Sequence, residues 1–262
     1  MLETFLKTYF KNRPFFLGLI RAKELELFQR FLPSVTTLSR CKILDFGSGD
    51  GFFTQTLFNR TVIPLTRIDS DQKIAGNTIK KRTDGRLVIY DGTILPFKSD
   101  SFDLLISNSV LEHVENVSQS IQELSRVLKK KGTFLCSVMT DRWETHLIGG
   151  LCLGKTYTAW MRRIQNHKNL LLFEEWQNHF EKAGLHTKRV IGYMDKKASL
   201  WFELLHYLSV YALILYKICG KWVIFPLLCD LFPVHRMVAP LVKQDIPLSD
   251  ASALFFVLRN DL

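Results

Sequence analysis

Apolar and polar residues follow two different rhythms along this chain. Over residues 1–40, aromatic and leucine side chains recur at roughly helical spacing, which predicts one or two amphipathic helices. From residue 42, short apolar runs of strand type alternate with segments of helical pattern. The runs are KILDF, PLTRID, LVIYD, SFDLLIS and TFLCSVM. Strands separated by helices predict an α/β fold with an open, doubly wound, mostly parallel sheet.

The helices between these runs carry recognisable ends. In VSQSIQELSRVLKKKG, residues 117–132, we expect Ser118 at the N-cap, three lysines in the last turn and Gly132 at the end. The segment DQKIAGNTIKKR, residues 71–82, is also predicted to be helical. A helix over 173–183 and the strands HTKRVIGYM and SALFFVLR would complete a seven-stranded sheet with helical insertions.

The pattern predicts an N-terminal helical cap over 1–40 and a domain over 41–262 with insertions at 141–172 and 194–250. The second insertion holds the most apolar stretch, 200–232, whose longest charge-free run is Leu204 to Tyr216. That run is shorter than the ~20 apolar residues of a spanning helix. Two interpretations stay open: a buried helical lid over a substrate pocket, or a membrane-surface element.

Amino-acid composition and charge exclude few functional classes. Apolar residues make up 47% and charged residues 23%, which favours a globular chain. The net charge of +10 permits nucleic acid, an anionic membrane or an acidic substrate and selects none. Five cysteines without metal or CxxC spacing read as small core residues in a reducing compartment. The N-terminus has no clean apolar signal region, so we expect a cytoplasmic protein, with peripheral membrane association left open.

The first specific motif is KILDFGSGDGFFT, residues 42–54, a strand followed by a glycine turn and a helix. Phe52 stands where a dinucleotide fingerprint has its third glycine, and Asp45 directly precedes the turn. A carboxylate there repels a pyrophosphate and favours a cationic ligand. Asp69 can accept both hydroxyls of a ribose, and Asp91 can accept an exocyclic amine. S-adenosylmethionine has a ribose, an adenine and a positive end.

Four motifs in order then carry a family resemblance: ILDFGSGDG, RIDSD, YDGTILPFKSDSFDLLISNSVLEHVEN and ELSRVLKKKGTFLCSV. Together they resemble the class I S-adenosylmethionine-dependent methyltransferases, in the small-molecule branch that includes the ubiquinone and menaquinone biosynthesis methyltransferases. The resemblance implies S-adenosyl-L-methionine as cofactor and a Rossmann-like fold. We expect the glycine-loop backbone to lie against the nucleoside, where a Cβ would collide.

The resemblance also implies roles by position. Five residues would line the methionine and ribose side of the cofactor: Asp45, Gly47, Ser48, Gly49 and Gly51. Asp69 would hold the ribose hydroxyls. Asp91 would accept the adenine amine with Gly92 beside it, and Asn108 would lie near the methionyl group.

A general base is needed only if the acceptor arrives protonated. His113 is the candidate, since its side chain titrates near neutrality and SVLEHVEN follows the fourth strand. The alternative is that His113 makes a structural hydrogen bond at a helix start. His146 is a more remote candidate. The ubiquinone O-methyltransferases carry an acid where this chain has Ser109, so we predict no metal at Glu112 and His113.

The sequence therefore predicts S-adenosylmethionine-dependent methyl transfer to a small, hydrophobic or lipid-linked acceptor, with oxygen favoured over carbon or nitrogen. A non-catalytic cofactor-binding or membrane-associated interaction protein is the main alternative. A nucleic-acid methyltransferase is disfavoured, because SNSV replaces an Asn/Asp-Pro-Pro-Tyr motif and no RNA-binding signature is present. No nucleic acid partner is expected. A nicotinamide-dependent oxidoreductase is disfavoured by Asp45 and Phe52.

Overall fold

The structure is a computed structural model that describes residues 2–58, 63–71, 86–223 and 234–261. The predicted helix over 71–82 coincides with the gap at 72–85 and lies outside the described residues. The chain divides into two compact units. The sheet unit comprises Phe28–Thr140, Gln165–Val190 and Leu254–Leu262, and the helical unit comprises Met1–Leu27, Asp141–Ile164 and Ile191–Ala253. The predicted cap at 1–40 and the insertion boundaries stay predictions.

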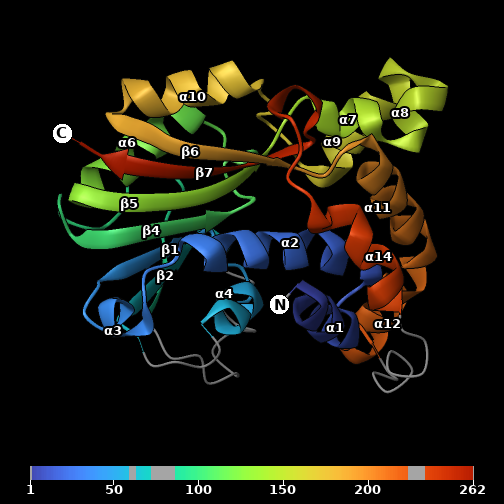
Figure 1. The fold of residues 1–262 in the computed structure, drawn as a ribbon, viewed down its shortest axis with the longest axis horizontal. Helices are drawn as coiled ribbons and strands as arrows, with labels where there is room; N and C mark the ends of the chain where they lie inside the picture. Colours follow the sequence, from blue (N-terminus) through green and yellow to red (C-terminus); the bar gives the residue numbers. More distant parts are fainter. Residues whose placement is uncertain (1, 59–62, 72–85, 224–233, 262) are drawn as a thin grey trace. The chain divides into compact units, whose positions relative to one another are not determined.

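The sheet confirms the predicted fold class: seven strands in the order β3-β2-β1-β4-β5-β7-β6 (Figure 1). The strand bounds are β1 Ile43–Phe46, β2 Leu65–Asp69, β3 Arg86–Ile89, β4 Phe102–Asn108, β5 Leu128–Met139, β6 Leu185–Tyr193 and β7 Ala253–Asn260. Strands β3, β2, β1, β4 and β5 pair in parallel. The order reverses between β1 and β4, and ligands of such sheets bind at the carboxyl ends of the strands near that reversal.

Helices cover both faces of the sheet. Neighbouring residues of a strand point to opposite faces of the sheet, so Phe255 and Phe256 of β7 contact helices on different faces. The Phe256 ring packs on Phe180 of α10 (Phe173–Lys182) with centroids 5.0 Å apart. The Phe255 ring packs on Phe28, in the last turns of α2 (Phe15–Phe31), at 4.9 Å. Helix α6 (Val117–Val127) shares the α10 face, and α3 (Val35–Leu38) and α4 (Phe52–Leu57) lie on the other (Figure 1).

The predicted ends of α6 are wrong at both termini. Asn116, not Ser118, is the N-cap, and its side chain accepts a hydrogen bond from the Gln119 amide at 3.0 Å. The lysines after Val127 belong to β5, whose pairing with β4 starts at Leu128 opposite Phe102. An irregularity follows between Phe102 and Leu104. Sheet pairing therefore overrides the local helix signal, and Gly132 sits within the strand rather than at a helix end.

The helical unit is built from α1 (Leu2–Asn12), most of α2, α7 (Arg142–His146), α8 (Ile148–Leu153), α9 (Lys155–Gln165), α11 (Lys196–Leu208), α12 (Val210–Cys219) and α14 (Val234–Lys243). One buried carboxylate organises part of it. Glu203 of α11 accepts hydrogen bonds from the Ile148 and Gly149 amides at the start of α8 and from the Tyr157 hydroxyl of α9. Three helices are thereby joined at one side chain.

Two sequence expectations on burial change in the structure. Cys136 is buried, but Cys152 and Cys219 are exposed, so those two are not core residues; Cys229 lies outside the described residues. In the part of the chain that the structure describes, no single helix has the length and apolar character to cross a membrane. Helices α11 and α12, bent by 49° at their junction, meet that test together by length and composition alone.

Candidate active site

Asp45 lies at the carboxyl end of β1, next to the strand-order reversal. Its side chain is 3% exposed and accepts a hydrogen bond from the Thr54 hydroxyl of α4. Burial, together with the smaller effect of the Asp69 charge, raises the pKa of this carboxyl to about 7, and this net value includes the lowering effects of Thr54 and Arg67. A cationic group beside Asp45 would favour its ionised form, so the residue is poised to respond to a positive ligand.

The glycine loop that follows is shaped by positive φ angles of 71°, 53° and 76° at Gly47, Gly49 and Gly51. At Gly47 an added Cβ would come within 2.5 Å of the Val110 side chain. At Gly49 the same test finds no heavy atom within 4 Å. At Gly47 a protein side chain already excludes a Cβ, and the expected contact of this residue with the nucleoside stays a prediction. Gly49 presents bare backbone to open space.

Asp69, at the carboxyl end of β2, braces this loop. Its Oδ2 accepts from the Gly49 amide at 2.8 Å, and its Oδ1 accepts from the Asp71 amide at 3.0 Å. Each carboxylate oxygen can accept a second hydrogen bond, so capacity for two hydroxyls remains. The sequence predicts that Asp69 binds hydroxyls, which stays a prediction, and it gives no sign of the contact with Gly49.

Asp91 comes two residues after β3 and is exposed. Its carboxylate accepts hydrogen bonds from the Thr93 hydroxyl at 2.6 Å and the Thr93 amide at 2.9 Å. The hydroxyl bond and then the amide bond lower the Asp91 pKa, so the group is ionised at neutral pH. Gly92 has a φ of 89° and open space where a Cβ would stand.

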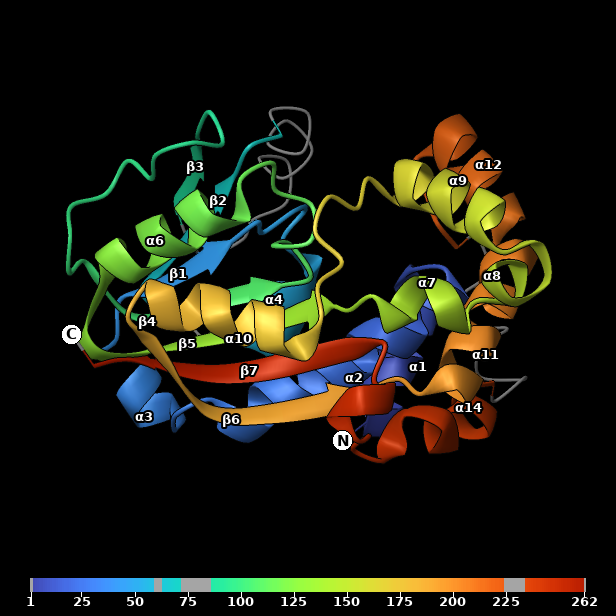
Figure 2. The ribbon, with the colours of Figure 1, turned by 90° about the horizontal axis from the view of Figure 1, so that it is seen from above.

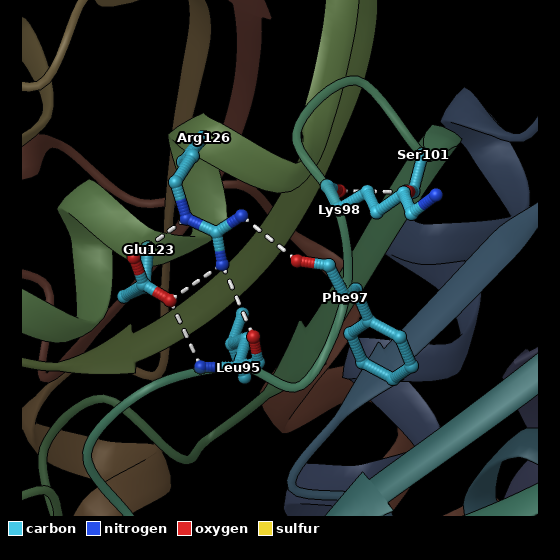
Figure 3. A network of polar contacts seen from close by, with 6 residues as sticks. All are labelled: Leu95, Phe97, Lys98, Ser101, Glu123 and Arg126. Atoms are coloured by element: carbon cyan, nitrogen blue, oxygen red, sulfur yellow. Dashed lines mark hydrogen bonds and ion pairs between the residues drawn. The ribbon is translucent and has the colours of Figure 1, made fainter.

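An ion pair on α6 holds the loop that follows Asp91, as Figure 3 shows. Arg126 binds Glu123 through two hydrogen bonds of 2.7 Å and donates to the Leu95 and Phe97 carbonyls at 3.1 and 2.8 Å. Glu123 in turn accepts from the Leu95 amide at 2.9 Å. Both backbone polar groups of Leu95 are therefore fixed to α6. We call this arrangement the loop clamp.

Asn108, the last residue of β4, is oriented by the neighbouring strand. Its Oδ1 accepts a hydrogen bond from the Ser137 hydroxyl of β5 at 2.8 Å. The same hydroxyl oxygen accepts from the Ser109 amide at 3.0 Å. Ser109 has a φ of 52°, a conformation that L-residues rarely adopt. Ser137 thus fixes the turn at the end of β4 and the direction of the Asn108 side chain.

His113 lies in the turn after β4 and is held by the segment 166–169. Its Nδ1 is 3.1 Å from the Asn166 carbonyl oxygen, and its ring stacks on His167 with centroids 5.0 Å apart. A carbonyl oxygen only accepts, so Nδ1 carries the proton and Nε2 of the neutral ring holds the lone pair. Asn169 donates to the Leu111 and Val114 carbonyls, which ties the two segments together. His113 therefore makes a structural hydrogen bond through Nδ1 and has a basic nitrogen at Nε2, so its roles as a structural residue and as a general base both stay open.

His146, the more remote candidate for a general base, makes its contacts within the helical unit. His146 belongs to the helical unit, where its Nδ1 is 2.9 Å from the Ser252 hydroxyl and its Nε2 is 3.5 Å from Asp250. Burial lowers the His146 pKa, and these contacts join α7 to the start of β7.

Among the described residues no group of three or more His, Cys, Asp or Glu is placed to hold a metal ion. The expectation of no metal at Glu112 and His113 stays a prediction.

The residues at these strand ends fit the proposed cofactor. Gly49 and Gly92 offer backbone with no side chain in front of it. The Ser48 hydroxyl is buried and has no hydrogen-bond partner among the described residues, so an unsatisfied group sits in the loop. Acids stand at the ends of β1 and β2 and just beyond β3. Bare backbone, hydrogen-bond acceptors and a carboxyl near its ionisation point suit a nucleoside with a cationic end.

Several supporting residues were missed from the sequence. Thr54 and Ser137 orient Asp45 and Asn108, and both are buried polar residues in otherwise apolar elements. A hydroxyl at a position that the pattern assigns to the core is the signal that could have found them. The loop clamp carries a weaker signal, a Glu and an Arg three apart on one helix.

Comparisons with known proteins agree with this geometry. Residues 44–136 match the family described as a methyltransferase domain. The chain is 36% identical over 124 residues to the biotin biosynthesis bifunctional protein of Cellvibrio japonicus, covering 47% of this chain and 24% of that protein. It is 27% identical over 161 residues to the ubiquinone biosynthesis O-methyltransferase of Rickettsia canadensis, covering 59% of this chain and 66% of that protein. In both cases the chain spans less than two thirds of its relative's length.

A solved structure shares the fold. An S-adenosylmethionine-dependent methyltransferase from Mesorhizobium loti superposes with a TM-score of 0.60 at 17% identity, covering 92% of this chain and all of that chain. At this identity the likeness concerns the fold, and the relatives act on different substrates by name. Residues 44–136 thus match a methyltransferase domain, and the chain has the fold of the S-adenosylmethionine-dependent methyltransferases.

Proposed function

We propose that this protein transfers the methyl group of S-adenosyl-L-methionine to a small, hydrophobic or lipid-linked acceptor, with oxygen favoured over carbon and nitrogen. The observation that carries the proposal is that Asp45, Asp69 and Asp91 stand at or just beyond the carboxyl ends of the adjacent parallel strands β1, β2 and β3, where Asp69 binds the bare backbone of Gly49. When bound there, the cofactor would supply an electrophilic methyl group on a sulfonium ion.

The protein's own residues have distinct tasks in this proposal. Asp69 would accept the ribose hydroxyls while it keeps the glycine loop in shape, and Asp91 would accept the adenine amine. Asn108, aimed by Ser137, would contact the methionyl end. Holding the cofactor rigidly favours an in-line approach of the acceptor at roughly 3–3.5 Å, which is a large part of methyl-transfer catalysis.

His113 is the proposed general base for a protonated hydroxyl acceptor. The Nδ1–H bond to Asn166 fixes the tautomer in which Nε2 can take a proton. The preference for oxygen also draws on the name of the ubiquinone O-methyltransferase relative. The hydrophobic acceptor is inferred from the apolar insertions. A second function, cofactor binding without catalysis, is favoured by the engagement of His113 in structural contacts with Asn166 and His167.

The test is turnover with methyl-labelled S-adenosylmethionine and fractionated lipid, quinone and phenol extracts. We expect label in an organic-soluble product. His113→Asn keeps a donor for the Asn166 carbonyl but lacks the basic nitrogen, so turnover should fall by about 10²–10⁴-fold with S-adenosylhomocysteine affinity unchanged. His186→Asn, on the exposed start of β6, is the matched control. Cofactor binding without transfer to any fraction would instead support the non-catalytic function.

A further inference from the structure

Helices α11 and α12 carry apolar side chains on faces that the protein does not cover. On α11, Ala198, Phe202 and Leu205 form the buried stripe. Trp201, Leu204 and Leu208 form a second stripe at the same helical spacing, exposed by 39%, 40% and 59%. A helix that is apolar on more than its core-facing stripe needs a second apolar environment.

The exposed stripe continues on α12. Tyr211, Ile214 and Ile218 recur at helical spacing and are exposed by 55%, 55% and 78%. Of the ten residues of α12, only Ala212 is buried among those whose side chains the structure describes. This exposure argues against the interpretation of the stretch as a buried lid, since a buried lid would cover these side chains.

Neighbouring helices extend the same surface. Tyr157 of α9 is 2.8 Å from the Tyr207 hydroxyl of α11, and both contact Glu203, so α8, α9 and α11 are packed together. Figure 2 shows α8, α9 and α11 gathered in one part of the helical unit. Large apolar side chains are exposed on α8 and α9 as well, among them Leu153 at 67% and Ile164 at 55%. We name the exposed apolar side chains of α8, α9, α11 and α12 the apolar surface.

The one acid on α8, α9, α11 and α12 is Glu203, which is buried, so the exposed charges of these helices are positive. Residues 148–165 contain Lys155, Arg162 and Arg163 and no acid, and residues 204–223 contain Lys217 and Lys221 and no acid. Arg162 is engaged by Glu144 through two bonds of 2.8 Å, which leaves four cations beside the surface. A polar protein partner would not require this one-sided pattern. An anionic bilayer complements it, because apolar groups enter the headgroup region while lysines and arginines attract the lipid charge.

An aromatic pair marks the border between the apolar and cationic parts. The rings of Tyr216 and Trp222 stack with centroids 4.1 Å apart, beside Lys217 and Lys221 in the sequence. Tyrosine and tryptophan prefer the interface between lipid and water, where one end of the ring is apolar and the other wet. Neither α11 nor α12 alone is long enough to cross a bilayer. The two together meet the length and composition test, but they are bent by 49° and α11 keeps a buried stripe, so a position in the bilayer surface is the arrangement that fits.

From these observations we propose that the apolar surface docks on an anionic lipid bilayer, with α11 and α12 lying in the headgroup region. The inference does not depend on methyl transfer. If the proposed function is also correct, docking places the enzyme where lipid-linked acceptors reside.

Vesicle flotation of the full chain tests the proposal. One set of vesicles is phosphatidylcholine alone, and the other is an equimolar mixture with phosphatidylglycerol. We expect flotation with the anionic vesicles and little with the neutral ones. Leu208→Gln/Ile214→Gln/Ile218→Gln should weaken the partitioning about tenfold or more, because exposed apolar groups are removed. Lys217→Gln/Lys221→Gln should weaken it by a similar factor on anionic vesicles.

Matched controls keep the outcome decisive. Val35→Thr removes an apolar side chain exposed by 59% in the sheet unit, and Lys130→Gln/Lys182→Gln removes two exposed cations there; both should float as wild type does. Wild type that stays unbound, or triple-variant protein that binds as well as wild type, would overturn the proposal. A wild-type dimer that the triple variant dissociates, with no vesicle binding, would assign the surface to a second copy and also overturn it. S-adenosylhomocysteine binding by the same samples separates this failure from failure of the proposed function.

Discussion

The loop clamp should control both local stability and cofactor affinity, and Arg126→Met tests this. The substitution removes the guanidinium and keeps a side chain of similar length. It deletes the two bonds to Glu123 and the bonds to the Leu95 and Phe97 carbonyls. The Leu95 amide keeps Glu123 as its acceptor. The clamp side chains then hold the loop at one point instead of three, while the backbone bond from the Asp100 amide to the Arg126 carbonyl stays.

The size of the effect follows from the exposure of the pair. Hydrogen bonds to a charged group contribute about 1.5–3 kcal/mol when buried. The Arg126 side chain is 32% exposed and Glu123 16%, so solvent replaces part of each bond and ~1 kcal/mol per carbonyl is reasonable. The ion pair, three residues apart on α6, adds ~0.5 kcal/mol. We expect a loss of about 2–3 kcal/mol in unfolding free energy.

The affinity should fall because a loosened loop must be ordered again when Asp91 binds its ligand. Ordering a residue costs ~1–2 kcal/mol, so the dissociation constant for S-adenosylhomocysteine should rise about tenfold. Hydrogen exchange should accelerate in peptides from 92–101 and stay unchanged over β6. Lys98→Met, in the same loop, also removes a cation but breaks no clamp bond, so it serves as the control. Wild-type exchange and affinity in Arg126→Met would refute the positioning role of the clamp.

Three further predictions follow from single sites. The Asp45 pKa of about 7 means that raising the pH from about 6 to about 8 ionises the group, so affinity for the cationic amino end of S-adenosylhomocysteine should rise about tenfold. Titration calorimetry of Asp45→Asn should show no such pH dependence. Gly49→Ala should lower the unfolding free energy by ~1–2 kcal/mol because of its positive φ, and it should abolish most cofactor affinity. Gly47→Ala should lower the unfolding free energy by ~3 kcal/mol because its Cβ meets Val110. Equal losses of the two variants in thermal unfolding would contradict this. Glu203→Ala leaves the Ile148 amide unsatisfied and leaves the Tyr157 hydroxyl with Tyr207 as its remaining partner, so urea unfolding should show a loss of ~2 kcal/mol, against a near-neutral Glu174→Ala.

The sequence allows the sheet and its acidic strand ends to be predicted because both depend on local patterns. Apolar runs of strand length, each ending in a polar residue, identify Asp45, Asp69 and Asn108 as neighbours at one edge once the strands are taken as parallel. The order of strands then follows from general rules for such sheets. The glycine spacing similarly predicts a tight turn at Gly49.

Long-range contacts explain what could not be predicted. Ser137 orients Asn108 across 29 residues, and Asn166 holds His113 across 53, with no local signal for either pair. The predicted C-terminal end of α6 is wrong for a related reason. Leu128 pairs with Phe102 of β4, and this long-range pairing outweighs the local helix propensity. The sequence carries no local sign of the contact between Gly47 and Val110, because Val110 lies beyond the next three strands of the chain.

Calorimetric titration of the full chain with S-adenosylhomocysteine tests the central claim most directly. The account predicts saturable binding by wild type and loss of most affinity in Asp69→Ala, because the ribose acceptor and the brace on Gly49 disappear together. Asp69→Asn, which keeps one acceptor oxygen, should lie between the two. Folded wild type that shows no binding heat at any accessible concentration would contradict the assignment of this site to S-adenosylmethionine.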